Sequence, residues 1–131
     1  MQNADDAHYP GRAPVDAYGN GGFRFAEMSH RGSILLLPSG IYGWPVSSID
    51  ELSPAVFARV FAEADAIEFL LLGCGNEMRR PAVSVREAFR ERKIGLELMT
   101  TGAAARTYNV LLAEDRAVAA ALIAVDDPTQ R

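Results

Sequence analysis

The sequence predicts a single α/β domain in which parallel strands alternate with crossover helices, joined to an N-terminal antiparallel β-hairpin region. Three short apolar runs have the length and composition of strands that are covered on both faces: Ile67–Leu72, Leu96–Met99 and Val118–Ala124. Segments with a helical spacing of apolar residues separate these runs. Because parallel strands need crossover connections, this order predicts a layered β/α arrangement with helices packed on a sheet.

The composition is that of an ordinary globular domain. The 131 residues are 49% hydrophobic and 23% charged, which suffices for one buried core. A formal net charge of −4 argues against a general nucleic-acid-binding protein, which needs a basic surface. No apolar stretch approaches the roughly 20 residues of a membrane helix, and the first residues lack the apolar core of a signal peptide. A single cysteine cannot form an internal disulfide, so we expect a soluble cytoplasmic protein without membrane insertion.

The two ends of the chain are polar. Residues 1–14 contain almost nothing apolar to bury and are expected to form a mobile tail. Residues 126–131 are expected to form a second polar tail. Since no internal repeat or linker interrupts the segment between them, residues 15–125 are predicted to form one domain.

The first part of this domain has the pattern of antiparallel strands. Val15–Tyr18 and Phe23–Glu27 are predicted strands on either side of Gly19–Gly22, whose Asn-Gly pair is typical of hairpin turns. Ser29–Gly32 is predicted to turn the chain again before a third strand at Ser33–Leu37.

The next segment leads to a helix. Pro38–Val46 contains two prolines and two glycines and is expected to be irregular, with Tyr42 and Trp44 in the core. Ser53 followed by Pro54 is a typical helix start. The apolar residues of this predicted helix recur at helical spacing, namely Val56, Phe57, Val60, Phe61 and Ala64.

Two strand-loop-helix units follow. In the first, Ile67–Leu72 ends at Gly73-Cys74-Gly75, and Ser84 with Glu87 fits a capping box for the following helix. In the second, Leu96–Met99 leads through Thr100-Thr101-Gly102 into a helix from about Ala103 to Glu114. Thr107 and Asn109 have low helix propensity, so we expect them to bond a neighbouring loop.

A candidate ligand or anion site lies where these two strands end. Ligands of open α/β sheets bind at the carboxyl ends of the strands. The site would comprise the two loops and three arginines that follow them: Gly73, Cys74, Gly75, Arg79, Arg80, Thr101, Gly102 and Arg106. Guanidinium groups and helix-start N–H groups could hold an anion there, although solvated arginines are the simpler interpretation.

Other kinds of site fit the sequence less well. Met78 stands where a dinucleotide fingerprint has its third glycine, so no cofactor is predicted. Cys74 has no histidine nearby in the sequence to act as its base, because His8 and His30 lie far upstream, so no catalytic residue is assigned. One cysteine and two separated histidines lack the spacing of metal ligands, and no metal site is predicted.

Several segments match a known pattern when taken together. They are Ser33–Pro38, Trp44, Ile67–Gly75, Gly95, Thr101, Ala103, Thr107, Tyr108, Asn109, Leu111, Glu114, Arg116, Val118 and Ala120–Ile123. In these residues the chain resembles a family of small α/β proteins, largely of unknown function, that includes the mitochondrial complex I assembly factor 3 and the adipogenesis-associated domain-containing protein. Relatives often have threonine where this chain has Cys74, so no role for a hydroxyl is carried over.

The resemblance implies an α/β fold and an assembly role through a protein partner, and supplies no established catalytic residues. Two functional classes therefore remain. The first is a non-enzymatic binding or assembly protein, assisting a respiratory or other membrane-associated complex. The alternative is a small-molecule or anion-binding protein, or an undescribed enzyme, that uses the crevice between Gly73 and Gly102. A closed crevice would favour the first class.

Overall fold

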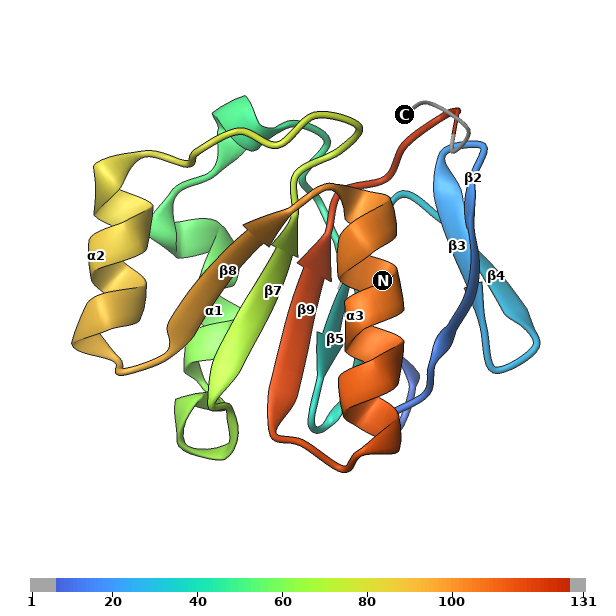
Figure 1. Ribbon diagram of the computed structural model, residues 1–131, viewed down its shortest axis with the longest axis horizontal. Coiled ribbons are helices and arrows are strands. Elements are labelled where there is room, and N and C mark those ends of the chain that lie inside the picture. Colours follow the sequence, from blue (N-terminus) through green and yellow to red (C-terminus); the bar gives the residue numbers. More distant parts are fainter. Residues whose placement is uncertain (1–6, 128–131) are drawn as a thin grey trace, which may run out of the picture.

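The apolar runs of the sequence form the interior of a six-stranded mixed sheet. The computed structural model describes residues 7–127 (Figure 1). The strand order is β1-β6-β5-β9-β7-β8, with β1 Ala7–Tyr9, β5 Ser33–Leu37, β6 Gly40–Trp44, β7 Phe69–Gly73, β8 Gly95–Met99 and β9 Val118–Leu122. Strand β7 pairs in parallel with β8 and β9, and β5 pairs antiparallel with β9. The predicted α/β class and its three parallel strands are confirmed.

A separate three-stranded sheet holds the N-terminal hairpins. Its strands are β2 (Val15–Gly19), β3 (Gly22–Phe25) and β4 (Met28–Arg31), paired antiparallel in that order. The predicted turn at Ser29–Gly32 is wrong, because Ser29 to Arg31 belong to β4. The chain turns instead at Ala26 and Glu27, whose φ angles of 49° and 62° are left-handed. Without a glycine there, the sequence carries no clear turn signal.

The helices begin and end differently from the sequence prediction. The helical segment starts at Pro54 with Ser53 at the N-cap position, as predicted, although the Ser53 side chain makes no cap hydrogen bond. It forms a short α1 (Ala58–Phe61) between 3-10 turns at Pro54–Phe57 and Ala64–Ala66 instead of one long helix. Helix α2 (Val83–Glu91) begins before Ser84, so the predicted capping box does not form. Helix α3 (Thr101–Ala113) is capped by Thr100, whose hydroxyl accepts a bond from the Ala103 N–H. A further 3-10 turn lies at Ile49–Glu51.

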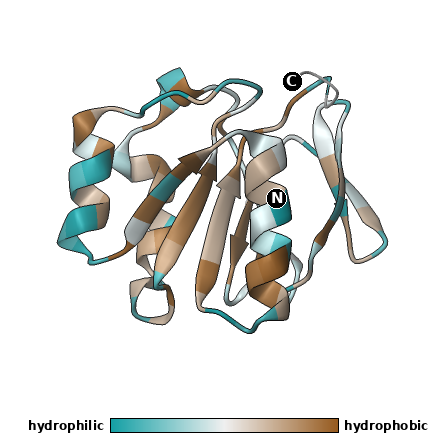
Figure 2. Cartoon of the chain, in the orientation of Figure 1, coloured by the Kyte–Doolittle hydropathy of each residue, from teal (hydrophilic) through white to brown (hydrophobic). Residues whose placement is uncertain are grey.

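The large sheet separates two hydrophobic cores. Helices α1 and α2 cover one face, here called the α2 face, and α3 with the small sheet covers the other, the α3 face (Figure 1). Side chains of β9 alternate between them: Ala119 and Ala121 join the first core, and Val118, Ala120 and Leu122 join the second. The interior strands are apolar along their whole length, whereas α2 alternates polar and apolar residues (Figure 2). This pattern fits a sheet buried on both faces.

An aromatic group fills the core on the α2 face. Trp44 lies 5.4 Å from Phe57 between ring centroids, and Phe57 meets Phe89 edge to face at 4.9 Å. Trp44 is buried and its indole N–H donates to the Val56 carbonyl at 2.8 Å. The segment expected to be irregular, Pro38–Val46, therefore contains a regular strand, β6, that carries Trp44 into the core as expected.

The segment predicted to be a mobile N-terminal tail also contains ordered structure. Strand β1 pairs with β6, and Ala13 is buried. The Arg12 guanidinium donates to the carbonyl of Arg116 at 2.6 Å, which fixes the segment beneath the end of α3. Residues 1–6 of that predicted tail, and 128–131 of the C-terminal one, lie outside the described range.

Candidate functional site

Backbone hydrogen bonds join the ends of the parallel strands beyond their regular pairing. The Cys74 N–H donates to the Met99 carbonyl at 2.8 Å, and the Ile123 N–H donates to the Gly73 carbonyl at 3.0 Å. The Thr101 N–H donates to the Gly75 carbonyl at 2.9 Å. These bonds hold the loop after β7 against both neighbouring strand exits, so the three ends form one continuous layer.

The Thr101 hydroxyl completes this layer. It donates to the Ile123 carbonyl at 2.7 Å and accepts from the Gly75 N–H at 3.0 Å. Thr101 is fully buried. Both hydrogen-bonding capacities of the hydroxyl are thus used to connect β7 with the residues that follow β9, and none is directed to solvent.

Two glycines allow this close packing. A Cβ atom at Gly73 would lie 2.9 Å from the Thr101 Cα, a distance that real Cβ atoms do not reach. At Gly102 a Cβ atom would lie 2.2 Å from the Tyr18 hydroxyl oxygen. Tyr18 comes from β2 and covers the first turn of α3. The crevice predicted between Gly73 and Gly102 is therefore filled by Thr101 and Tyr18.

Cys74 lies beneath the loop rather than at its surface. Its side chain is 6% exposed, and its Sγ lies 3.3 Å from the Arg79 carbonyl, to which the thiol can donate. Reactive cysteines are partly exposed and have a basic neighbour. The position of Cys74 instead suits a small residue that fills the space under residues 75–79.

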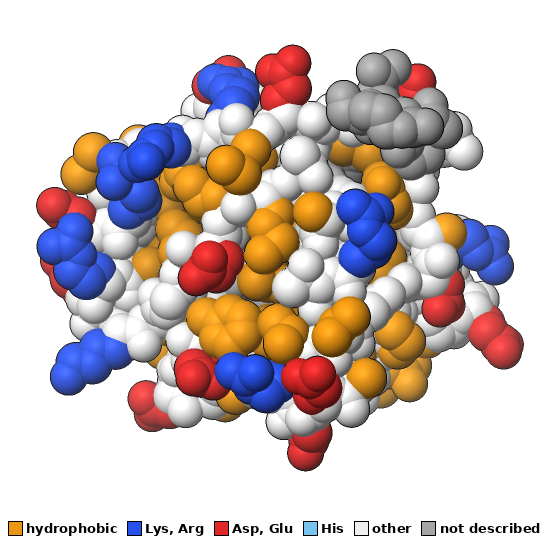
Figure 3. Space-filling model, viewed as in Figure 1, with side chains coloured by type: hydrophobic (Ala, Val, Ile, Leu, Met, Phe, Trp, Pro, Cys, Tyr) orange, Lys and Arg blue, Asp and Glu red, His pale blue; other side chains and the backbone are white. Residues whose placement is uncertain are grey.

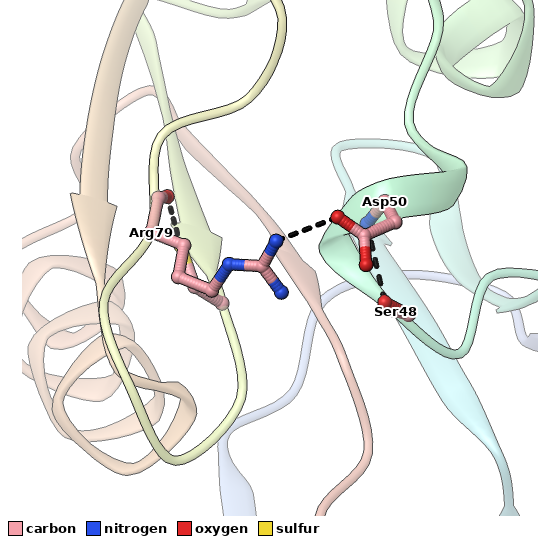
Figure 4. Close-up of polar contacts among 4 residues, drawn as sticks. Ser48, Asp50 and Arg79 are labelled. Carbon is pink, nitrogen blue, oxygen red and sulfur yellow. Dashed lines mark hydrogen bonds and ion pairs between the residues drawn. The ribbon is translucent and has the colours of Figure 1, made fainter.

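The predicted arginines have different neighbours. Arg79 pairs with Asp50, its guanidinium lying 2.6 Å from the carboxylate, and Asp50 in turn is held by a bond from its N–H to the Ser48 hydroxyl (Figure 4). Arg106 lies beside Gly102 and Tyr18. Arg80 is exposed and forms no ion pair with any residue between 7 and 127.

The structure thus brings Gly73, Cys74, Gly75 and Thr101 together at the strand ends. Tyr18 and Asp50 could not be identified from the sequence, because each reaches the site from a distant segment. Asn109 bonds a neighbouring segment as expected: its side chain accepts from the Val15 N–H and donates to the Val15 carbonyl, both at 2.8 Å. This pair ties α3 to the start of the small sheet.

The loop after the strand exit presents an unusual surface. Met78 and Val83 are large hydrophobic residues with exposed fractions of 63% and 55%. In the described part of the chain, the backbone N–H groups of residues 76–80 donate no hydrogen bond. We call residues 76–83 the β7–α2 loop surface. Exposed apolar groups, arginines and unpaired backbone donors make it suited to contact another molecule.

The hollows of the surface lie elsewhere. One of about 300 Å³ lies on the small sheet, and one of about 550 Å³ lies between β6 and α1 beside Trp44 and Val56. The second is bordered by Arg59, whose guanidinium stacks 4.2 Å above the Tyr42 ring. Neither hollow includes a residue of the predicted strand-end site.

Residues 7–127 offer neither a metal site nor a membrane-spanning helix. Within this range no cluster of three or more histidine, cysteine, aspartate or glutamate side chains is arranged to hold a metal ion. None of the helices in the same range has both the length and the apolar character needed to cross a bilayer.

Residues 15–123 match a protein family model described as a protein of unknown function (DUF498/DUF598). The chain belongs to this family. Its curated relatives include an uncharacterised protein of Rhodobacter capsulatus, 35% identical over 115 residues, with 88% of this chain and 87% of the relative covered. Another is the mouse NADH dehydrogenase [ubiquinone] 1 alpha subcomplex assembly factor 3, 31% identical over 117 residues. That match covers 89% of this chain but 63% of the mouse protein, which is longer.

Solved structures of proteins with similar sequences have the same fold. A crystal structure described as an outer membrane protein from Bartonella henselae is 56% identical, with a TM-score of 0.87 over 91% of this chain and 100% of the other. A Bordetella pertussis protein described as a Mth938-like domain is 25% identical, with a TM-score of 0.77 over 97% of this chain and 94% of the other. The small α/β family suggested by the sequence is thereby confirmed, together with its likeness to assembly factor 3.

Proposed function

We propose that this protein is a non-enzymatic binding protein that assists the assembly of a respiratory or other membrane-associated complex by contacting a protein partner. The observation that carries the proposal is the closure of the strand ends. The place where open α/β sheets bind small molecules is filled here by Thr101 and Tyr18. The names of the assembly-factor relatives support a protein client. The site of action is proposed to be the cytoplasm, in keeping with a single unpaired cysteine.

The proposed contact is the β7–α2 loop surface. Basic and hydrophobic side chains lie together over this loop and the adjoining end of α2 (Figure 3). Arginine and methionine are enriched in protein interfaces, where a few such residues dominate the binding energy. On a chain with a net charge of −4, Arg80 adds an exposed positive charge to this loop, beside Arg79, which pairs with Asp50, and Glu77. A partner segment with acidic and apolar residues would complement this surface.

The proposal is tested by charge reversal in the native host. Arg79→Glu with Arg80→Glu should strongly reduce recovery of co-purifying proteins, because it replaces attraction to an acidic partner by repulsion. The melting temperature should barely change, since the exposed Arg79–Asp50 pair contributes only about 0–1 kcal/mol. Quantitative mass spectrometry of pull-downs would measure the recovered partners.

A matched control carries the same change in charge at the opposite end of α2, with Arg90→Glu and Lys93→Glu. It should leave partner recovery unchanged. Equal recovery with both double variants would remove the β7–α2 loop from the proposal. Turnover of a metabolite by the purified protein, abolished by a substitution at Thr101 or Gly102, would overturn the non-enzymatic proposal and restore the alternative of a strand-end active site.

A further inference from the structure

The small sheet carries a hollow of about 300 Å³ that the proposed function does not use. Its walls and floor come from all three strands and from the first hairpin turn: Ala17, Tyr18, Gly19, Asn20, Gly22, Phe23, Arg24, Ser29, His30 and Arg31. The volume is at the lower end of the range for small-molecule sites, roughly 300–1,000 Å³. The hollow lies outside both the strand ends and the β7–α2 loop surface.

Strand register explains why two arginines border this hollow. Arg24 of β3 lies opposite Ser29 of β4, and Gly22 lies opposite Arg31. Residues two apart on a strand share a face, so Arg24 and Arg31 are diagonal neighbours on the same face of the sheet. Phe23 and Phe25 alternate with them and are buried against the large sheet.

Small residues lie beside the arginines on the same face of the sheet. Ala17 lies opposite Arg24, and Gly19 lies opposite Gly22, so both belong to the face that carries the arginines. The face therefore has open space beside Arg24, on the side of β2. The hollow thus follows from the sequence pattern of the three strands.

Each arginine of this hollow lies near a polar or charged side chain. Arg24 donates from Nη1 to the Ser29 hydroxyl at 3.1 Å, which orients its guanidinium. Among the described residues, neither Arg24 nor Arg31 forms an ion pair. The nearby carboxylate is Asp126: its Oδ1 and the Arg31 Nη1 lie 3.5 and 3.6 Å from the position of a Cβ on Gly21. Two adjacent like charges on one sheet face are unfavourable, and an anion between them would relieve the repulsion.

We propose that this hollow binds the phosphate group of a small phosphorylated molecule. Two guanidinium forks and the Ser29 hydroxyl supply the donors that phosphate oxygens accept in charge-assisted hydrogen bonds. The small residues Ala17, Gly19 and Gly22, which also line the hollow, leave room for the organic part of such a molecule. Recognition at this site is independent of the partner contact at the β7–α2 loop.

The test is a titration followed by ¹⁵N-¹H correlation spectra at constant ionic strength, with glycerol 3-phosphate in one arm and inorganic phosphate in the other. Saturable shifts are expected in residues 19–24 and 29–31. Arg31→Gln and Arg24→Gln should each weaken the affinity by about tenfold, the usual loss for a charged hydrogen bond. Arg90→Gln, an exposed arginine on α2, is the matched control and should leave the affinity unchanged.

Comparing the two titrations shows whether the hollow recognises a phosphoester or the phosphoryl group alone. Tighter binding of glycerol 3-phosphate supports a phosphoester, whereas equal affinities support recognition of the phosphoryl group alone. The spectra also report whether each variant remains folded. Shifts that do not saturate with either probe, or that are unaffected by both arginine variants, would overturn the proposal.

Discussion

At the scale of single residues, the Thr101 hydroxyl joins the loop after β7 to the residues that follow β9. Its side chain supplies a donor for the Ile123 carbonyl and an acceptor for the Gly75 N–H, and it is fully buried. Removing the hydroxyl while keeping the volume would leave both backbone groups without a partner. Buried polar groups that lose their partner cost more than the bond itself contributes.

We therefore predict that Thr101→Val lowers the free energy of unfolding by about 2 kcal/mol. Urea denaturation followed by circular dichroism would measure the loss. Thr101→Ser keeps the hydroxyl and is the control, with a smaller loss from the missing methyl group. If Thr101→Val were as stable as the original protein, the hydroxyl would not be what holds the strand ends together.

Tyr108 gives a prediction for alkaline pH. Burial raises the pKa of its phenol above 10.0, and the positive charge of Arg12 partly offsets the rise. The folded protein therefore favours the neutral phenol more than the unfolded chain does. This contribution to stability is fully present below the unfolded pKa of about 10 and is lost as the pH rises through the folded value.

Tyr108→Phe has no proton to lose at this position. Near pH 8 the variant should be about as stable as the original protein, because the buried hydroxyl makes no regular hydrogen bond and has the Arg12 side chain beside it. Near pH 11 the original protein should lose more stability than the variant. The urea midpoints of the two proteins, measured at both pH values, give the difference in stability. The effect of the other titrating groups cancels, because both proteins contain them. A difference that is the same at both pH values would contradict the predicted pKa.

At the scale of elements, the sequence predicts the strands and the helix that are defined by residues close together in the chain. Strands β7, β8 and β9 and helix α3 are recognisable from apolar runs and glycine exits, and parallel pairing then brings Gly73, Cys74, Gly75 and Thr101 together. The sequence does not predict strand β6, because Gly40 is a residue type typical of turns. Position 40 needs glycine because a Cβ there would lie 2.6 Å from the Tyr9 carbonyl oxygen on β1. Such a requirement depends on a partner strand more than thirty residues away.

The arginines of the candidate site illustrate the same limit. Arg79 follows the strand exit in sequence, but its side chain pairs with Asp50 in a 3-10 turn of a different segment. No local pattern links these two residues. The phosphate hollow likewise depends on the register of β2, β3 and β4, and the turn between β3 and β4 was predicted three residues too late.

The N-terminal strand gives a prediction at this scale. Arg12 holds the segment after β1 through its bond to the Arg116 carbonyl and lies 3.8 Å from the Asp115 carboxylate. We predict that Arg12→Ala lowers the free energy of unfolding by about 1–2 kcal/mol, as expected for a charged hydrogen bond. Hydrogen exchange of β1 should accelerate more than that of β7. Unchanged protection of β1 would show that pairing with β6 alone fixes this strand.

At the scale of the whole molecule, one sheet supports both cores. The alternation along β9 places successive side chains in opposite layers, so a loss of packing on one face is transmitted through the same backbone to the other. Trp44 is the only tryptophan and lies on the α2 face. Ile34 of β5 is fully buried on the α3 face. These two residues allow the coupling of the cores to be measured.

If residues 7–127 unfold as one cooperative unit, Ile34→Val should lower the stability reported by Trp44 by about 1 kcal/mol, although the deleted methylene lies in the opposite core. Urea unfolding would be followed in parallel by Trp44 fluorescence and by far-ultraviolet circular dichroism. Both signals should give the same midpoint, shifted equally by the substitution. A dichroism midpoint that moves while the fluorescence midpoint stays fixed would mean that the α3 face, with the small sheet and its hollow, unfolds independently of the α2 face.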